Sequence, residues 1–374
     1  MKIAVFGHKR IPSREGGVEI VAEELSVRMA AKGHRVTCYN RGGHHVSGAD
    51  YDAQRCSTYR QVQLKTVPTI DKKGLAAVTS SFFAAVQCAF SDADVVHIHA
   101  EGPGLMCWLP KLFGKRVIAT VHGLDWQREK WKSGFGARYI RMGEKMTVRF
   151  ADEIIVLSKN VQDYFRRTYG RQTRMIPNGV ARPQCREAAQ IVENYGLEAD
   201  SYILFLGRLV PEKGVHYLID AYRMLRTDKK LVIAGGTSDT DAYVQALKEK
   251  AAGDENILFT GFVQGQLLEE LYSNAWVYVL PSDLEGMPLS LLEAMSYGNC
   301  CVVSDIPECT EVVEDRAVVF PRGNTAALRD CLQQLCDDPE AGKAYRETAA
   351  DFICGKYNWD TVTELTLALY GEKT

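Results

Sequence analysis

Short runs of β-branched and other apolar residues alternate with helical patterns along the whole chain. This alternation is typical of parallel sheets, because each crossover between parallel strands needs a connection long enough for a helix. The sequence therefore predicts an α/β fold with helices on both faces of its sheets. Strands are expected near 3–6, 35–39, 62–66, 95–98, 116–121, 153–156, 174–176, 203–205, 231–234, 257–259, 276–280, 300–303 and 317–319, and helices near 18–32, 75–90, 137–150 and 159–168.

The chain is long enough for two domains, since 374 residues exceed the usual size of one hydrophobic core. The strand rhythm is interrupted by the polar segment 181–201, where we predict the linker and a hinge for domain closure. This gives an N-terminal domain over 1–184 and a C-terminal domain over 185–356. A last helical run at 359–370 has no strand after it.

Composition excludes several classes of protein. A net charge of −2 gives no general attraction to nucleic acid. The apolar run at the N-terminus is too short for a signal peptide, and no segment reaches about 18 uninterrupted apolar residues, so we expect a cytoplasmic protein. The 11 cysteines form no C-x-x-C pair and are predicted to be reduced thiols.

The stretch from Pro281 to Gly298 combines a turn with a helix start. Pro288 is predicted to be the first helical residue, because proline needs no N–H partner there. The N–H groups of Leu289 and Ser290 would then point outward at the positive end of the helix dipole, a favourable place for an anion.

Two carboxylates flank this helix start. Glu285 lies in the turn, Glu293 lies on the helix, and Gly286 and Met287 supply small and apolar surroundings. A diphosphate bound by the N–H groups would leave one carboxylate to accept hydrogen bonds from a sugar and the other from a ribose. The alternative is that both are ordinary exposed acids.

Other strand ends in the second half carry matching features, and ligands gather at the carboxyl ends of parallel strands. Arg208 and Lys213 supply two cations suited to a diphosphate. Gly235 allows close backbone approach, and the main chain at Phe262 and Val263 could line a slot for a base.

Residues at strand ends in the first half of the chain could contact a sugar and an acceptor hydroxyl. The pair Gly16 and Gly17 stands at a helix start, and His122 follows a strand. Glu101 and Asp125 are candidate acceptor contacts. The alternatives are that the glycine pair only forms a turn and that His122 only caps its strand.

His97 and His99 could share a metal, but no further ligand completes a zinc set, so we interpret them as ordinary histidines at a pocket edge. Two D-x-D strings are also present. Asp92 and Asp94 precede their strand and therefore lie at the wrong end of the sheet, and Asp239 and Asp241 read as helix capping. We predict no metal, because Arg208, Lys213 and a helix dipole supply equivalent charge.

A basic stripe recurs at helical spacing, formed by Arg138, Arg141, Lys145 and Arg149. Nearby lie Trp126, Arg128, Lys130, Trp131 and Lys132. Such a surface could associate peripherally with an anionic membrane, and a solvated helix face explains it equally well.

The string E-G-M-P-L-S-L-L-E-A-M, with its two glutamates eight positions apart, and the pattern G-R-x-x-x-x-K-G resemble the signatures of the retaining nucleotide-sugar glycosyltransferases of GT-B fold, of the group 1, family 4 type. The resemblance covers nearly the whole chain. It implies two Rossmann-like domains whose parallel sheets face across a cleft, and a C-terminal helix, 357–374, that crosses back to the first domain.

The resemblance also implies roles for the candidate residues. Glu285 and His122 would be catalytic, beside the reacting sugar. The glycine pair would face the donor, and the segments at Gly235, Phe262 and Val263 would border the base. The family implies attack on the same face of the sugar, within an ion pair or through a covalent intermediate.

The predicted function is transfer of a sugar from a UDP-, dTDP- or GDP-linked donor to an acceptor hydroxyl, without metal or another cofactor. The segment H-G-L-D-W-Q-R-E-K-W looks most like bacterial capsule and exopolysaccharide transferases, rhamnosyltransferases among them. That implies a glycan or lipid-linked glycan acceptor at the inner face of the membrane. A nucleotide-sugar epimerase of the same fold and a non-catalytic nucleotide-sugar-binding protein are the alternatives.

Overall fold

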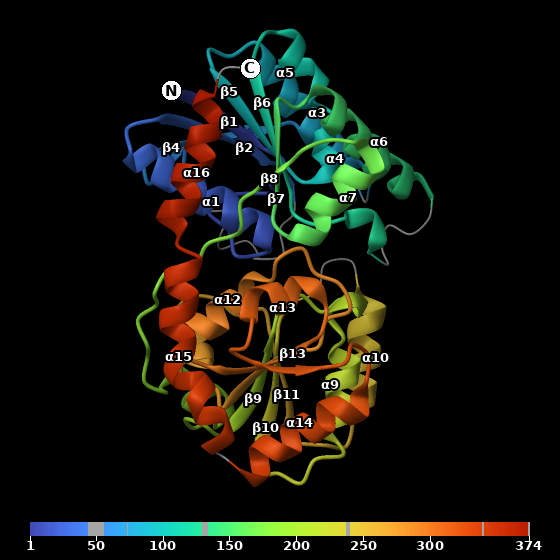
Figure 1. Ribbon diagram of the computed structural model, residues 1–374, viewed down its shortest axis with the longest axis vertical. Coiled ribbons are helices and arrows are strands. Elements are labelled where there is room, and N and C mark those ends of the chain that lie inside the picture. Colours follow the sequence, from blue (N-terminus) through green and yellow to red (C-terminus); the bar gives the residue numbers. More distant parts are fainter. Residues whose placement is uncertain (44–55, 73, 129–133, 237–239, 339, 373–374) are drawn as a thin grey trace. The chain divides into compact units, whose positions relative to one another are not determined.

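In the computed structural model the chain forms two compact units (Figure 1). Unit 1 comprises Met1–Asn178 and Trp359–Thr374, and unit 2 comprises Gly179–Asn358. The structure describes residues 1–43, 56–72, 74–128, 134–236, 240–338 and 340–372. Each unit is an α/β unit with its own sheet, which confirms the predicted fold class.

Unit 1 contains an eight-stranded sheet in the order β3-β4-β2-β1-β5-β6-β7-β8. All neighbouring strands are parallel except β3 and β4. The strands are β1 (Lys2–Phe6), β2 (Arg35–Arg41), β3 (Thr58–Tyr59), β4 (Val62–Val67), β5 (Val95–His99), β6 (Arg116–Val121), β7 (Glu153–Val156) and β8 (Arg174–Met175). The helices are α1 (Gly17–Ala31), α3 (Leu75–Ala89), α4 (Glu101–Gly104), α5 (Trp108–Leu112), η1 (Asp125–Gln127), α6 (Gly134–Phe150), α7 (Lys159–Tyr169) and α16 (Trp359–Gly371).

Unit 2 contains a six-stranded parallel sheet in the order β11-β10-β9-β12-β13-β14. The strands are β9 (Tyr202–Leu206), β10 (Lys230–Ala234), β11 (Ile257–Gly261), β12 (Val277–Leu280), β13 (Cys300–Ser304) and β14 (Val318–Phe320). The helices are α8 (Gln190–Tyr195), η3 (Pro211–Lys213), α9 (Val215–Tyr222), α10 (Asp241–Ala251), α11 (Gly265–Ser273), α12 (Leu289–Ser296), α13 (Pro307–Val313), α14 (Thr325–Asp337) and α15 (Glu340–Lys356).

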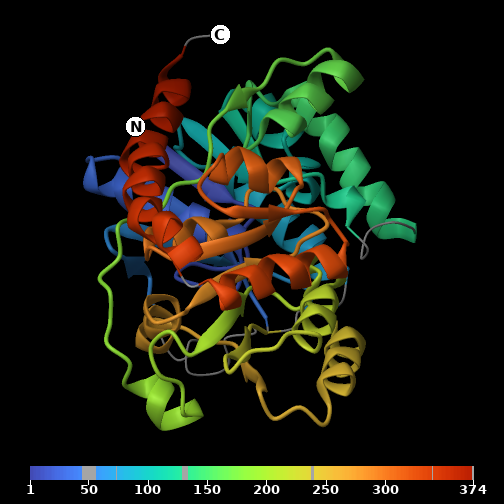
Figure 2. The ribbon, with the colours of Figure 1, turned by 60° about the horizontal axis from the view of Figure 1, so that its bottom comes forward.

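The central strands are buried on both faces, which explains why they read as continuous apolar runs. Every residue of β5, β12 and β13 is buried. Figures 1 and 2 show helices on both faces of each sheet. The predicted strands agree with the observed ones to within two residues at each end. The sequence did not predict the two-residue strand β3 or the short helices α4, α5 and α8, because elements this short carry little periodicity.

The strand order reverses at one point in each sheet. In unit 1, β1 lies between β2 and β5, and in unit 2, β9 lies between β10 and β12. The carboxyl ends of β1 and β5, and of β9 and β12, are therefore the topological switch points at which open α/β sheets bind ligands.

The segment 181–201 is not a linker, contrary to the sequence prediction. It belongs to unit 2, where Glu270 of α11 accepts hydrogen bonds from the N–H groups of Ala189 (3.0 Å) and Ile191 (3.1 Å). Glu270 is fully buried, so its carboxylate needs these donors. The chain passes between the units at 178–179 and at 358–359, and Val180 donates to the Tyr357 carbonyl at 2.7 Å.

The last helix, α16, packs on α1 within unit 1 (Figure 2). At its end, the Tyr370 hydroxyl lies 2.6 Å from His97 Nδ1, and His97 Nε2 lies 2.7 Å from Thr120 Oγ1. All three side chains are buried, so α16 supplies one of the partners that a core histidine of β5 requires.

Tyr370→Phe should therefore destabilise unit 1 by about 1–3 kcal/mol, because it leaves His97 Nδ1 buried without a partner. Thermal denaturation measures this loss. Tyr59→Phe is the control, since Tyr59 hydrogen-bonds Glu23 at 3.1 Å from the half-buried hairpin strand β3 and should cost less. Equal losses in the two variants would contradict the anchoring role of Tyr370.

Candidate functional site

The end of β9 in unit 2 leads into the two predicted cations. Arg208 lies two residues after the end of the strand, and Lys213 is the last residue of the 3-10 turn η3. Gly235, at the end of β10, has a φ of +158°, and a Cβ there would lie 1.8 Å from the Gly207 carbonyl oxygen. Only glycine allows the ends of β9 and β10 to approach this closely.

Lys213 and Glu285 form a largely buried ion pair, with Nζ and Oε1 2.6 Å apart. The Ser282 hydroxyl donates to the same Glu285 oxygen at 2.6 Å. The side chains of Lys213 and Glu285 are only 12% and 9% exposed, so their attraction is screened less than that of a surface pair. The sequence placed both residues at strand ends but did not predict this pairing.

Two backbone contacts hold the pair together. Gly214 has a φ of +67°, and a Cβ there would lie 2.0 Å from the Pro281 carbonyl oxygen. Asp283 N–H donates to the Glu212 carbonyl at 2.8 Å. The turn after β9 is thus fixed against the loop after β12, at the switch point of the sheet.

The helix α12 begins at Leu289 and not at Pro288, which corrects the sequence prediction. Pro288 is the N-cap, with an extended ψ of 103°, and its carbonyl accepts from Leu291 N–H (3.1 Å) and Leu292 N–H (3.2 Å). The N–H groups of Leu289 and Ser290 precede these first helical bonds, so they remain the helix-start donors that the sequence predicted. Gly286 and Met287, also predicted donor contacts, are buried in the loop before the helix.

Two tyrosines that the sequence analysis missed surround this helix. Tyr272 donates to Glu293 Oε2 at 3.1 Å, and Tyr278 donates to Ser290 Oγ at 2.8 Å. Burial raises the pKa of both hydroxyls well above the usual value, so both remain donors at neutral pH. The apolar runs that contain these tyrosines gave no signal that their hydroxyls point at α12.

The ends of β10 and β11 lie together, since Gly235 N–H donates to the Gly261 carbonyl at 2.9 Å. Phe262 is half-buried and Val263 is buried directly after β11. The structure thus places Gly235, Phe262 and Val263 at adjoining strand ends of unit 2, and their contact with a base stays a prediction.

Histidines meet at the ends of β5 and β6 in unit 1. His99 Nδ1 and His122 Nε2 lie 2.9 Å apart, and the His97 and His99 rings lie 4.2 Å apart. His97 and His99 are buried core residues, which corrects their interpretation as pocket-edge histidines. Only His122 is partly exposed, and His99 orients it.

The two predicted acceptor contacts are joined to each other. Glu101 Oε2 accepts from Asp125 N–H at 2.7 Å. Asp125 is partly exposed and pairs with Arg128 at 3.1 Å, whereas Glu101 is only 1% exposed. This burial does not support direct contact between Glu101 and an acceptor. The glycine pair lies at another strand connection, with Gly16 as the N-cap of α1 and Gly17 as its first residue.

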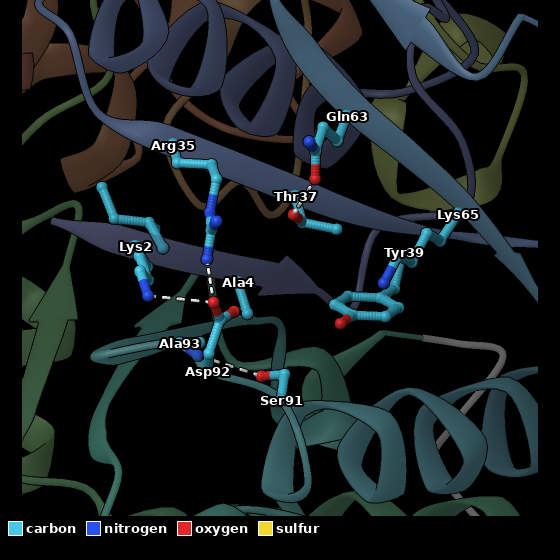
Figure 3. Close-up of a pocket in the computed structure, with 11 residues that line it drawn as sticks. Lys2, Ala4, Arg35, Thr37, Tyr39, Gln63, Lys65, Ser91, Asp92 and Ala93 are labelled. Atoms are coloured by element: carbon cyan, nitrogen blue, oxygen red, sulfur yellow. Dashed lines mark hydrogen bonds and ion pairs between the residues drawn. The ribbon is translucent and has the colours of Figure 1, made fainter.

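The described aspartates of the two D-x-D strings, Asp92, Asp94 and Asp241, have other places in the fold. Asp92 lies at the amino ends of the strands, beside a hollow of about 170 Å³, where it pairs with Lys2 and Arg35 (Figure 3). These partners hold the pKa of Asp92 at about 2. Asp94 accepts from Lys2 N–H. Thr240, not Asp241, is the N-cap of α10, and Asp239 lies outside the described residues. In the described part of the chain, no three His, Cys, Asp or Glu side chains could hold a metal ion together.

The basic stripe is exposed along α6. Arg138, Arg141, Lys145 and Arg149 all lie on this face, and the Arg141 guanidinium stacks over Trp126 at 5.2 Å. Lys130, Trp131 and Lys132 lie outside the described residues. Of the helices that the structure describes, none is both long and apolar enough to cross a membrane.

Two family models match consecutive parts of the chain. The model of glycosyltransferase family 4 matches residues 15–182, and the model of glycosyl transferases group 1 matches residues 189–352. The chain belongs to the group 1 glycosyltransferases. Glycosyl transfer is therefore favoured over the epimerase and over the non-catalytic binder.

Curated relatives of this glycosyltransferase include several sugar-transferring enzymes. Alpha-D-kanosaminyltransferase from Streptomyces kanamyceticus is 26% identical, with 74% of this chain and 77% of the relative covered. Alpha-maltose-1-phosphate synthase from Mycolicibacterium smegmatis is 27% identical, with 74% and 79% covered. O-antigen chain mannosyltransferase B from Escherichia coli is 31% identical over 49% of each chain.

Solved structures show the same fold. Sucrose-phosphate synthase from Thermosynechococcus elongatus superposes with a TM-score of 0.83 at 21% identity, covering 99% of this chain and 98% of that chain. HepE from Anabaena, in complex with UDP and glucose, gives a TM-score of 0.82 at 15% identity and 98% coverage of each chain. These similarities confirm the GT-B fold of the glycosyltransferase.

The buried histidines of unit 1 predict acid sensitivity. Burial lowers the pKa of His97 to about 3, below its value near 6.5 in the unfolded chain. Below pH 6.5 the unfolded state therefore binds more protons than the folded state. The contribution of neutral His97 to the free energy of unfolding is complete above pH 6.5, and it falls by about 1.4 kcal/mol for each pH unit below that value.

We expect the melting temperature of unit 1 to fall between pH 7 and pH 5, and His97→Gln to flatten this slope while lowering stability at pH 7. Thermal melts across that range measure both effects. The same slope in the variant and the wild type would show that His97 is not the group responsible.

Proposed function

We propose that this glycosyltransferase transfers a sugar from a nucleoside diphosphate donor to an acceptor hydroxyl with retention of anomeric configuration. The observation that carries the proposal is the Lys213–Glu285 ion pair at the β9/β12 switch point. It combines a cation for a phosphate with a carboxylate for a sugar in one largely buried place.

The donor diphosphate would be bound by Arg208, Lys213 and the N–H groups of Leu289 and Ser290. These groups stabilise the charge that develops on the departing phosphate as the bond from the anomeric carbon breaks. Lys213 forms an ion pair with Glu285 in the structure, so the Lys213 ammonium group would contact both a bound phosphate and the Glu285 carboxylate.

The sugar and the ribose have separate carboxylates in this proposal. Glu285 orients the sugar and stabilises positive charge at its anomeric carbon. Glu293, whose carboxylate is hydrogen-bonded by Tyr272, accepts hydrogen bonds from the ribose hydroxyls. His122 would contact the transferred sugar. The acceptor oxygen bonds to the anomeric carbon on the face that the phosphate leaves, and its proton passes to the departing phosphate oxygen.

We infer that the reaction needs no metal, because two cations and a helix start supply positive charge to the diphosphate. A uridine diphosphate sugar is the first donor to test, since HepE has been solved with UDP and with UDP-glucose. The dTDP- and GDP-linked sugars are the other candidates.

We propose a lipid-linked glycan of surface polysaccharide synthesis as acceptor, at the inner face of the membrane. The exposed basic face of α6 would attract anionic lipid, and the Escherichia coli relative is an O-antigen mannosyltransferase by name.

Donor binding can be tested by thermal shift with UDP-, dTDP- and GDP-sugars in the presence of EDTA. One nucleotide class at about 100 times its Kd should stabilise the wild-type protein by about 2.7 kcal/mol. Arg208→Ala and Glu293→Ala should lose most of that shift, whereas Arg329→Ala, at an exposed Arg329–Asp330 ion pair on α14, should keep it. Stabilisation only with added metal, or by no nucleotide sugar, would contradict the donor site.

Glu285→Gln tests the charge at the reacting sugar. The amide keeps an acceptor for Ser282 but removes the negative charge, so turnover should fall about 10²–10³-fold, as for other preorganised charge-stabilising groups. Release of nucleoside diphosphate from the donor found by thermal shift measures this, and the donor shift should persist. Unchanged turnover would remove Glu285 from the chemistry.

A further inference from the structure

Two glutamates meet inside unit 1 behind the loop that follows β6. Glu101 on α4 and Glu144 on α6 are each only 1% exposed, and the charge of Glu144 lies close enough to raise the pKa of the Glu101 carboxyl. The backbones of the two helices touch, since a Cβ at Gly143 would lie 2.1 Å from the Glu101 carbonyl oxygen. The glycine therefore allows the carboxyl groups to meet.

Of the four carboxyl oxygens of Glu101 and Glu144, two accept hydrogen bonds and two have no hydrogen-bond donor. Glu101 Oε2 accepts from Asp125 N–H, and Glu144 Oε1 accepts from the hydroxyls of Tyr164 (2.9 Å) and Tyr169 on α7. Glu101 Oε1 and Glu144 Oε2 are buried with no donor. A single proton between these two oxygens would satisfy both.

The surroundings favour such a proton. The charged side chains with the largest effect on Glu101 are the carboxylates of Asp125 and Glu144, and both raise its pKa. Arg128 pairs with Asp125 at 3.1 Å. Two buried negative charges side by side would carry both a desolvation cost and mutual repulsion.

We propose that Glu101 and Glu144 share one proton, with Glu101 as the neutral acid, and that this pair positions the loop carrying Asp125. The Glu101 O–H donates to Glu144 Oε2, while Glu101 Oε2 holds the Asp125 N–H. Glu144, bound by two tyrosines, fixes the pair to α6 and α7. Both glutamates are positioning residues; only the role of the Asp125 loop in acceptor binding rests on the proposed function.

The pH dependence has a definite sign. Burial and the neighbouring carboxylates raise the pKa of Glu101 well above its usual value. A raised folded pKa means that the folded state binds the extra proton, so the stability it contributes is fully present below the unfolded pKa of about 4.3 and is lost progressively as the pH rises from there to the folded pKa. Glu101→Gln keeps both hydrogen bonds, because its amide donates to Glu144 and its carbonyl accepts from Asp125, but it has no proton to lose.

The first test is thermal melting of the full chain from pH 6 to pH 9.5. Between pH 6 and the alkaline end, Glu101→Gln should gain about 2–4 °C in melting temperature relative to the wild type. Glu144→Gln should show the same relative gain. Glu364→Gln, at an exposed pair with Lys32 in the same unit, is the control and should run parallel to the wild type. Parallel curves for all variants would overturn the shared proton.

The second test measures positioning by hydrogen exchange at pH 7 over residues 122–128. Glu101→Leu should lose protection there, and Glu101→Gln should retain it. If the Glu101→Leu protein folds and its protection over residues 122–128 is unchanged, the positioning role is wrong. If that variant does not fold, a loss of protection in Glu101→Gln would overturn the positioning role. Neither test uses a donor or acceptor, so both can succeed even if the transfer reaction proposed above is wrong.

Discussion

The contact between Gly214 and the Pro281 carbonyl is the constraint on which the candidate donor site depends. Parallel pairing of β9 with β12 brings the two strand ends to one side of the sheet, but pairing alone leaves their loops free to diverge. Because position 214 has no Cβ and a positive φ, the turn after β9 can lie directly on the loop after β12. Lys213 and Glu285, one residue and four residues from this contact, can then form an ion pair.

Unit 1 is organised by a different requirement, the satisfaction of buried polar groups. His97, Glu101 and Glu144 lie inside the unit, where an unpartnered polar atom is costly. Each takes partners from distant parts of the chain, such as Tyr370 from the last helix and Tyr164 and Tyr169 from α7. These contacts tie the ends of β5 and β6 to the surrounding helices and leave His122 and Asp125 as the more accessible groups.

The sequence could predict the elements and the strand ends at which the candidate residues lie. Apolar runs such as Val277–Leu280 are long enough, and buried enough, to be recognised locally. It could not predict pairs made between elements far apart in the chain. Lys213 and Glu285 are 72 positions apart, and the Tyr272 hydroxyl reaches Glu293 only through the packing of α11 on its neighbours.

Errors of the sequence analysis have the same origin. Polarity suggested a linker at 181–201, yet the buried Glu270 draws that backbone into unit 2. Position after a strand suggested an acceptor contact at Glu101, yet this side chain is buried beside α6. In both places a buried carboxylate, whose partners depend on tertiary packing, decided the outcome.

The path of the chain between the units has a consequence for synthesis. Unit 2 is inserted between two segments of unit 1, and its two ends are joined by the hydrogen bond from Val180 N–H to the Tyr357 carbonyl. A ribosome therefore begins unit 1 first but completes unit 2 before it, because α16 follows unit 2 in the chain. His97, at the centre of β5, therefore gains its Tyr370 partner only after unit 2 has been synthesised.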